Sequence, residues 1–422
     1  MKIVVLGSGG REHALVWKLA QSVSPKDIYT LPGNGGIPNS VAIDLADFDD
    51  VKQFCQEKHV ELVIVGPEAP LAQGIVDYFA NTGPSTSLRT GIKVFGPSQN
   101  AARLESSKIW AKQFMAKYGV ATGDFQVFTN PADAQKLIHK LQGDLVIKYD
   151  GLAAGKGVYV CSSENEALEA LDDLLKNYGK DAPFLIEQKL TGAEISVIGF
   201  TDGKHVQLLR PSQDHKQLLD GDTGPNPGGM GAYCPVTFLT DAMMKDIMTS
   251  VINPTLKGLQ GEHLDYKGAI YFGLMMTDQG AKLLEYNVRL GDPEAEVILP
   301  AMKSDLVQLI LSCFDGTLKD YTMEFNPGFF IDVVLVSGGY PKSYAKGYEI
   351  TGLKRLSKET QVFHAGTALK NGKLVTSGGR VLNIVAHGAD LASTIEKVYQ
   401  ECKLVEFKDI YYRKDIGKRN LS

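Results

Sequence analysis

The sequence predicts a multidomain protein that combines α/β and α+β architecture, with a parallel, Rossmann-like sheet first and a mostly antiparallel domain last. The chain has 422 residues, which is too long for one hydrophobic core. Its first part alternates short apolar strands with helical stretches, as in a parallel sheet covered by helices. Its last part, from about residue 329, is rich in strands and hairpin signals.

Composition and charge exclude several classes of protein. The net charge of −5 gives no electrostatic reason to expect a nucleic-acid partner, because proteins that bind polyanions usually carry a basic surplus. No apolar segment approaches the length of a membrane-spanning helix and no signal peptide is evident, so we expect a cytoplasmic protein without a membrane partner. The five dispersed cysteines form no CxxC pair and are interpreted as buried thiols in a reducing compartment.

Strands in the first part each end in a turn that carries glycine or proline. Apolar runs predict them at 2–6, 28–31, 61–65 and 92–95, and a helix is expected from about residue 11 to residue 21. In open sheets of this kind, ligands bind beside the carboxyl ends of the strands. The polar turns after these strands are therefore candidate ligand sites. The loop at 83–90 carries no functional signal.

The first turn, Gly7-Ser8-Gly9-Gly10-Arg11-Glu12, invites a dinucleotide-binding interpretation, which two features weaken. Glu12 stands where that fingerprint needs its third glycine, and the second strand ends at Pro32-Gly33-Asn34 without a carboxylate for a ribose. The amides of Gly9 and Gly10, beside a helix N-terminus, can still hold an anion. We predict that they bind a phosphate of some other ligand; a tight turn without a ligand is the alternative.

A strand–loop–strand unit in the middle of the chain is the strongest chemical signal. Strands are predicted at 144–149, which includes Lys148, and at 158–161. The loop between them is not a P-loop, because only three residues separate Gly151 from Gly155 and because Gly157 replaces the usual Ser or Thr. A glycine hairpin can fold over a triphosphate and donate amides to it, and a lysine can add a positive charge. A plain hairpin with a solvated lysine is the alternative.

Two further segments would complete a nucleotide site. The strand at 184–188 leads into a hinge whose backbone can pair with adenine, and Glu194 beyond it can accept hydrogen bonds from ribose hydroxyls. A strand at 283–289 would place Glu285, Asn287 and Arg289 on one face. A carboxylate and an amide oxygen suit Mg²⁺, and a neighbouring arginine suits an oxyanion. An exposed sheet face is the alternative.

The rest of the chain gives mainly structural signals. Asp292-Pro293-Glu294 predicts a helix start with Asp292 as its N-cap. Strands at 330–336 and 380–386, an Asn-Gly hairpin turn at 371–372 and an amphipathic helix at 390–402 are expected in the last domain. There, Gly378-Gly379-Arg380 can close part of the site.

The order of these features resembles the ATP-grasp superfamily, whose members hold ATP between two α+β subdomains. The resemblance rests on Lys108, Lys148, the loop at 151–157, Glu187, Glu194, Glu285 and Asn287. Within that superfamily the chain is similar to the phosphoribosylamine–glycine ligase family over essentially its whole length. The strings specific to that family are Ser212-Gln213-Asp214-His215-Lys216 and Gly228-Gly229-Met230-Gly231-Ala232-Tyr233.

The resemblance implies a domain division and a reaction. A substrate-binding domain would span 1–103, an ATP-grasp domain 104–326 with a lid subdomain at about 121–192, and a C-terminal domain 327–422. With ATP as cosubstrate, the enzyme would phosphorylate the carboxylate of glycine. The amine of 5-phosphoribosylamine would then attack the glycyl phosphate, giving glycinamide ribonucleotide, ADP and phosphate in purine biosynthesis. The family also suggests a monomer.

The resemblance implies roles for particular residues as well. The ATP site would contain Lys108, Lys148, Gly155, Lys156, Gly157, Glu187, Lys189, Leu190 and Glu194. Glu285 and Asn287 would hold one Mg²⁺ or Mn²⁺; the strand at 269–277 has no acid, so a second ion stays open. Catalysis would rest on Arg289, Asp214 and Lys216, with residues 220–231 as a lid. The substrates would be bound by Gly9, Gly10, Arg11, Glu12, Asn34, Glu68, His215, Gly229 and Asp292.

Two alternatives remain open at this stage. The first is another ATP-grasp carboxylate–amine ligase or carboxylase that acts on a nucleotide precursor. The second is a non-catalytic nucleotide-binding or NAD-linked protein. If ADP formation depends on glycine, the first alternative is excluded. If ATP rather than NAD raises the melting temperature of the protein, the NAD-linked alternative is excluded.

Overall fold

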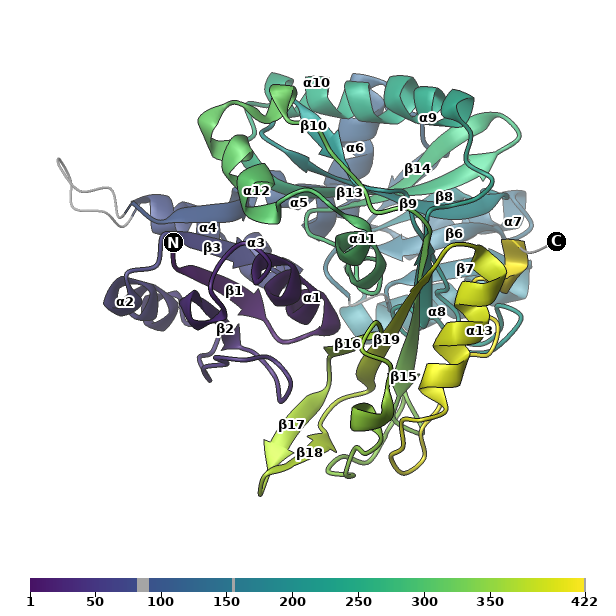
Figure 1. Cartoon of the computed structure of the whole chain (residues 1–422). Helices are drawn as coiled ribbons and strands as arrows, with labels where there is room; N and C mark the ends of the chain where they lie inside the picture. The colour runs from purple at the N-terminus through teal and green to yellow at the C-terminus, as the bar shows by residue number, and fades with distance from the viewer. Residues whose placement is uncertain (82–90, 154–155, 421–422) are drawn as a thin grey trace.

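The N-terminal part is a parallel sheet with helices on its faces, as the sequence predicts (Figure 1). The computed structural model describes residues 1–81, 91–153 and 156–420. In the order β2-β1-β3-β4, the strands are β1 (Ile3–Gly7), β2 (Ile28–Pro32), β3 (Leu62–Val65) and β4 (Lys93–Pro97). The accompanying helices are α1 (Gly10–Leu19), α2 (Phe48–Lys58), α3 (Glu68–Ala72) and α4 (Ile75–Asn81). Strands β1 and β3 are buried along their whole length, which explains their uniformly apolar sequences.

The sheet continues from the N-terminal part into the central part of the chain. Strand β4 pairs with β13 in antiparallel fashion, and β13 lies between β9 and β14. The bounds are β9 (Ala193–Thr201), β10 (Val206–Leu208), β13 (Tyr266–Thr277) and β14 (Gly280–Asn287). The helices of this part are α5 (Gln99–Ser106), α6 (Lys108–Tyr118), α9 (Asp241–Ile247) and α10 (Asn253–Gly261). Side chains of β3, α6, α10 and β14 share one hydrophobic core, so the two parts are packed together.

An antiparallel sheet with its own core faces the long strands. Its order is β5-β8-β6-β7, and the predicted strand–loop–strand unit is its β6–β7 hairpin. The bounds are β5 (Phe125–Phe128), α7 (Pro131–Lys140), β6 (Asp144–Tyr149), β7 (Val158–Ser162), α8 (Glu164–Tyr178) and β8 (Phe184–Gln188). Its core, which includes Phe128, Leu145 and Phe184, is a separate cluster. This small subdomain therefore packs as a unit of its own.

A second antiparallel sheet joins the C-terminal part to a segment from the middle of the chain. Its order is β11-β12-β15-β19-β16. The bounds are β11 (Gln213–Asp214), β12 (Gly231–Cys234), β15 (Phe329–Val336), β16 (Gln361–His364) and β19 (Arg380–Gly388). Helix α13 (Leu391–Cys402) packs on this sheet, and the hairpin of β17 (Thr367–Lys370) and β18 (Lys373–Thr376) projects from it (Figure 1). The positive φ angles of Asn371 (51°) and Gly372 (75°) confirm the predicted turn.

The predicted helix start at Asp292 is wrong. Residues 292–294 form a turn, and α11 (Ala295–Ala301) begins after it with Glu294 at the N-cap position. The carboxylate of Asp292 instead pairs with Arg380 Nη1 at 3.1 Å, so it is not available to cap the helix. The next helix, α12 (Leu306–Asp315), has Asp305 as its N-cap.

The fold class is confirmed: a parallel N-terminal sheet, a central part with a second, antiparallel sheet and an antiparallel C-terminal sheet. Within residues 1–81, 91–153 and 156–420, no helix is both long and apolar enough to cross a bilayer.

Candidate active site

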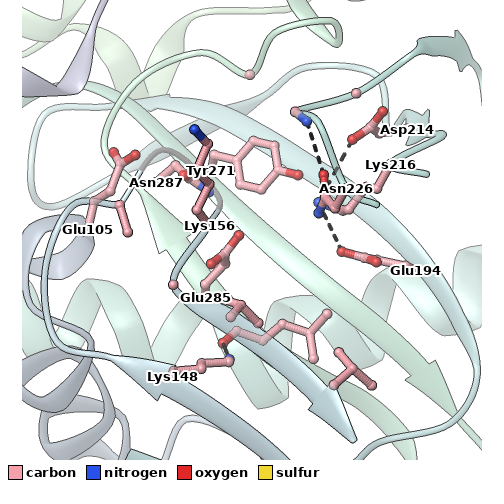
Figure 2. Close-up of a pocket in the computed structure, with 18 of the residues that line it drawn as sticks. Glu105, Lys148, Lys156, Glu194, Asp214, Lys216, Asn226, Tyr271, Glu285 and Asn287 are labelled. Carbon is pink, nitrogen blue, oxygen red and sulfur yellow. Dashed lines mark hydrogen bonds and ion pairs between the residues drawn. The ribbon is translucent and has the colours of Figure 1, made fainter. Parts of the chain in front are cut away.

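A cleft of about 1700 Å³ lies where the facing sheets and the C-terminal part meet. It is lined by most of the residues that the sequence singles out. These are Arg11, Glu68, Lys108, Lys148, Lys156, Gly157, Glu187, Lys189, Leu190, Glu194, Asp214, Lys216, Gly229, Glu285, Asn287, Arg289 and Asp292. Figure 2 shows the centre of the cleft, with Glu285 between Lys148 and Asn287 and with Asp214, Lys216 and Glu194 grouped to one side. Gly155 and the loop at 83–90 lie outside the described residues.

Lys148 is held at the cleft by a buried carboxylate that it shares with a second lysine. Its Nζ lies 2.9 Å from Glu187 Oε2, and Lys112 Nζ lies 3.0 Å from the same oxygen. Burial lowers the pKa of Lys112 to about 8, although the Glu187 carboxylate opposes this shift. The Glu187 side chain therefore binds lysines. The predicted pairing of the hinge with adenine concerns its backbone and stays a prediction.

Lys108 ties the glycine loop to the start of α6. Its Nζ donates to the Gly151 carbonyl at 2.9 Å. The carboxylate of the preceding residue, Asp150, accepts from Ser107 Oγ and from the Ile109 amide, both at 3.0 Å. These bonds fix the start of the loop at 151–157 to α6. Lys108 therefore lies beside the β6–β7 hairpin, at the cleft.

Glu285 and Asn287 form a pair of oxygen donors on β14. Burial alone would raise the pKa of Glu285, but Lys216, Lys148 and Lys108 outweigh it and keep the pKa below its usual value. Among the described residues no group of three or more His, Cys, Asp or Glu side chains gathers as a metal site. A carboxylate and an amide oxygen nevertheless fit Mg²⁺, which usually takes one or two protein ligands and completes its shell with phosphates and water.

Arg289 follows β14 and is surrounded by carboxylates. Its Nη2 lies 3.0 Å from Glu105 Oε1, its Nε lies 3.4 Å from Glu68 Oε2, and Nη2 also donates to Asn287 Oδ1 at 3.1 Å. Burial disfavours the charged guanidinium, but Glu105 and Glu68 more than compensate and raise the pKa of Arg289. Glu68 therefore lies beside Arg289, and its predicted role in substrate binding stays a prediction. Glu105 is a member of the site that the sequence reasoning missed.

Asp214, Lys216 and Glu194 form a charged cluster at one side of the cleft (Figure 2). Lys216 Nζ lies 3.1 Å from Glu194 Oε1 and 3.9 Å from Asp214 Oδ2. Burial lowers the pKa of Lys216, but Glu194 and its neighbours outweigh burial and raise it well above its usual value. Burial, helped by the carboxylate of Glu294, raises the pKa of Asp214 to about 8.

The C-terminal part closes the cleft through Arg380, as the Gly378-Gly379-Arg380 segment suggested. Arg380 Nη1 donates to the Asp292 carbonyl at 2.9 Å and also to the Gly228 carbonyl. Tyr340 donates its hydroxyl proton to the carbonyl of Pro227. These two bonds attach the end of the glycine-rich segment at 220–231 to the C-terminal part, and Arg413 and Asp415 hold its start through Asp222 and the Gly221 amide. Gly229 lies at the cleft wall beside Asp214.

The N-terminal turn is arranged differently from the predicted anion cradle. The amide of Gly9 donates to Glu12 Oε2 at 2.6 Å, and Glu12 Oε1 accepts from Arg11 Nε at 2.6 Å. Glu12 itself thus occupies the helix N-terminus, in the manner of a capping box. A Cβ on Gly10 would come within 2.5 Å of Glu296 Oε1, so this glycine serves close packing.

Other predicted substrate residues also lie away from the cleft lining. Asn34 Nδ2 donates to the carbonyls of Ser8 and His364, at 2.9 and 2.7 Å, and braces its own loop. His215 is buried, its Nε2 accepts from the Gly417 amide at 3.2 Å, and burial lowers its pKa to about 3. Of the predicted substrate set, only Arg11, Glu68, Gly229 and Asp292 line the cleft.

The comparisons with known proteins give one family over the whole chain. Models of phosphoribosylglycinamide synthetase match residues 1–105 (N domain), 106–295 (ATP-grasp (A) domain) and 330–419 (C domain). The chain is 44% identical over 426 residues to the phosphoribosylamine–glycine ligase of Clostridium acetobutylicum, covering 99% of this chain and 100% of that protein. It is also 44% identical to the trifunctional purine biosynthetic protein adenosine-3 of Homo sapiens, covering 100% of this chain and 42% of that protein.

A solved structure supports the same relationship. The crystal structure of the phosphoribosylamine–glycine ligase of Thermotoga maritima superposes with a TM-score of 0.82 at 36% identity, covering 99% of this chain and 100% of that one. The resemblance noted in the sequence, the cleft and these matches agree, and the chain belongs to the phosphoribosylglycinamide synthetase family, that of the phosphoribosylamine–glycine ligases.

Proposed function

We propose that this chain is an ATP-dependent ligase that joins glycine to 5-phosphoribosylamine through a glycyl phosphate. The products are glycinamide ribonucleotide, ADP and phosphate. The observation that carries the proposal is one shared cleft. It is lined both by Lys108 and Lys148, which suit a triphosphate, and by Glu285 and Asn287, which suit a metal. The family membership supplies the identity of the substrates.

The nucleotide lies between the β6–β7 hairpin and β14 in this proposal. Lys148 and Lys108 reach the cleft from β6 and α6 and bind phosphate oxygens as point charges. Lys156, Gly157, Lys189, Leu190 and Glu194 line the side of the cleft where the base and ribose would lie. A hydrophobic wall of Val146, Val158 and Met275 fits an adenine face.

Phosphoryl transfer needs positioned charge more than a covalent residue. Lys148 and Lys108 stabilise charge on the phosphates, and Arg289 holds the glycine carboxylate or the oxygens of the transferred group. A divalent ion on Glu285 and Asn287, when bound, adds positive charge at the phosphates. The cleft walls from the glycine-rich segment at 220–231 keep water from the acyl phosphate.

The second substrate enters from the side of the N-terminal and C-terminal parts. Arg11 lies in the first turn of α1, Glu68 is the first residue of α3, and Arg380 lies on β19; all three line the same cleft. A guanidinium suits the phosphate of phosphoribosylamine, and a carboxylate suits its hydroxyls. We further propose that the ion is Mg²⁺ or Mn²⁺, bound singly, and that the enzyme is a cytoplasmic monomer.

The test is the substrate dependence of ADP formation by the purified full chain. We expect turnover only with glycine and phosphoribosylamine together, and no turnover with bicarbonate in place of glycine. Lys148→Ala should lower kcat/KM for ATP by roughly 100-fold, because a charge that acts on the transferring group is lost. Lys136→Ala, which removes an exposed lysine of α7, is the matched control. Glycine-independent ADP formation would instead favour a different ATP-grasp ligase or carboxylase.

A further inference from the structure

The loop that follows β11 is bonded to a segment close to the C-terminus. We call residues 217–228 the cleft loop and residues 411–419 the C-terminal strap. His215 lies just before the cleft loop, and its Nε2 accepts from the Gly417 amide of the strap at 3.2 Å. The buried ring of His215 therefore joins the strap to the base of the loop.

One buried arginine lies at the centre of the contacts between the strap and the cleft loop. Arg413 is fully buried, and its Nε and Nη2 donate to the two carboxylate oxygens of Asp415, both at 2.8 Å. Its Nη1 donates to the Gln217 carbonyl and to Asp222 Oδ1, both at 2.9 Å. Asp415 Oδ2 also accepts from the Gly221 amide at 2.8 Å. Arg413 and Asp415 thus fix both the start of the loop and its turn.

The turn of the cleft loop has a backbone conformation that needs such support. Gly221, Asp222 and Gly224 have positive φ angles of 71°, 54° and 83°. Left-handed backbone is unfavourable for most residues that carry a side chain, although Asp and Asn tolerate it better than others. The carboxylate of Asp222 is held on this turn by Arg413 and by Arg419, near the end of the strap. These ion pairs therefore stabilise the loop in its observed conformation.

Apolar packing contributes little to the position of this turn. Leu219 is 43% exposed, and residues 223–226 are exposed as well. A segment with few buried contacts opens readily unless polar contacts hold it. The contacts with the C-terminal strap are therefore what keeps the turn in place.

The cleft loop forms part of the cleft wall. Gln217, Asp222 and Asn226 line the cleft, as does Arg419 of the strap. Figure 2 shows Asn226 beside Lys216. In the proposed function this cleft contains a glycyl phosphate, which water destroys, so the position of the wall decides whether water reaches the intermediate.

We propose that the C-terminal strap is a latch that couples ATP use to ligation, with Arg413 as a positioning residue. This rests on the proposed function; Arg413, being buried, acts through the cleft loop and not on a substrate. With the loop held, the amine of the second substrate attacks the acyl carbon of the glycyl phosphate, and the bond from that carbon to the phosphate oxygen breaks. With the loop open, water attacks the same carbon and the same bond breaks. Glycine and phosphate are released, so ATP and water have become ADP and phosphate without ligation.

The ratio of ADP formed to glycinamide ribonucleotide formed, measured with the full chain, tests the latch. The wild type should give about one ADP per product, and with glycine alone it should not sustain ADP formation. Asp222→Asn keeps a side chain that tolerates the left-handed turn but loses the charge that both arginines bind. It should raise the ratio at least about twofold and should sustain ADP formation with glycine alone.

Arginine variants separate a latch from a general loss of structure. Lysine keeps the charge but not the paired donors, so Arg413→Lys should raise the ratio less than Arg413→Met. If the Arg413 variants are poorly folded, Arg419→Gln replaces them, because this side chain is 42% exposed and its removal leaves the buried contacts intact. It should also raise the ratio, by less than Asp222→Asn. Arg355→Met is the matched control, since it removes an exposed arginine that pairs with Glu406 elsewhere in the C-terminal part.

Hydrogen exchange gives a measurement that does not depend on turnover. Amides of residues 217–228 should exchange faster in Asp222→Asn than in the wild type, while those of β15 and β19 are unchanged. Faster exchange of the loop with an unchanged ratio would overturn the latch, and so would a raised ratio with faster exchange throughout the chain. A wild type that forms ADP without glycine would remove the proposed function itself, whatever the exchange of the loop shows.

Discussion

At the scale of single residues, the most consequential arrangement is one carboxylate shared by two lysines. Glu187 Oε2 accepts from both Lys148 and Lys112, while Lys112 also donates to Thr122 Oγ1 at 2.6 Å. In the proposed mechanism a triphosphate binds Lys148, and Glu187 then keeps Lys112 as its counterion. The buried carboxylate is therefore never left without a positive partner, which would be strongly unfavourable.

Lys112→Met tests this sharing. Without Lys112, Glu187 depends on Lys148 alone, and moving Lys148 to a phosphate leaves a buried unpaired charge. We expect KM for ATP to rise about tenfold or more, equivalent to roughly 1.4 kcal/mol, with KM for glycine unchanged. Steady-state kinetics with each substrate varied gives both values. Lys117→Met, on the same helix but exposed and paired with Glu262, should behave as the wild type; equal effects of the two changes would refute the sharing.

Some residues of the site were predictable from the sequence and others were not. Lys148, Glu285 and Asn287 stand in a recognisable order on strands, and their meeting in one cleft is as expected. Lys112 had a signal that went unused, since it lies four residues after Lys108 and hence on the same helix face. Glu105 and Glu294 had none, because their contacts with Arg289 and Tyr271 depend on packing between distant segments.

At the scale of elements, the start of α1 shows how a side chain can take a place that sequence reasoning reserves for a ligand. Glu12 bonds to the Gly9 amide and to Arg11, and a Cβ on Gly66 would come within 2.1 Å of Glu12 Oε1. The first helix and the ends of β1 and β3 therefore meet around one buried carboxylate. The glycines of these turns make room for it.

Glu12→Ala should destabilise this part of the molecule. It removes the bond to the Gly9 amide and leaves Arg11 buried without its carboxylate, a change that typically costs about 3–5 kcal/mol. Urea denaturation followed by tryptophan fluorescence is suitable, because Trp17 lies on α1. Glu57→Ala, which removes an exposed carboxylate bonded to Gln53 on α2, should shift stability by no more than about 0.5 kcal/mol. Equal midpoints for both variants would contradict the proposed role of Glu12.

Long apolar elements were easier to predict than short ones. The strands of the parallel sheet and the β6–β7 hairpin follow from apolar runs bounded by turns, and the structure reproduces them within a residue or two. Strands β11 and β12 flank a glycine-rich segment that reads as a loop. They are strands because they pair with each other and β12 pairs with β15, a contact between residues about a hundred positions apart that no local pattern encodes.

At the scale of the whole molecule, buried neutral histidines link stability to pH. Burial lowers the pKa of His13 and His215 to about 3 and that of His364 to about 4. The His13 ring accepts a hydrogen bond from the His364 amide at 2.8 Å, which joins the first helix to the C-terminal sheet. In the unfolded chain these groups titrate near pH 6.5, so unfolding takes up protons below that pH.

The free energy of unfolding should therefore be fully present above about pH 6.5 and should fall as the pH is lowered toward 3. Each histidine that stays neutral in the fold should contribute a loss of roughly 2 kcal/mol between pH 6.5 and pH 5. Denaturation midpoints across this range measure the slope. His215→Gln should make the slope shallower, whereas His263→Gln, at an exposed position, should not. A midpoint independent of pH over this window would be inconsistent with buried neutral histidines.

One sheet combines β11 and β12 with β15, β19 and β16, so a division of the coding sequence between β12 and β15 would split this sheet between two polypeptides. If the gene were divided before the codon for Phe329, the longer polypeptide would have β12 as an unpaired edge strand. The shorter polypeptide would contain β15 without its neighbour β12. Open edges recruit other strands, so each half would be prone to self-association until it met its complement. Fusion at either end leaves this sheet whole. The trifunctional human relative matches the whole of this chain with 42% of its own length, so it joins the unit to further sequence without splitting it.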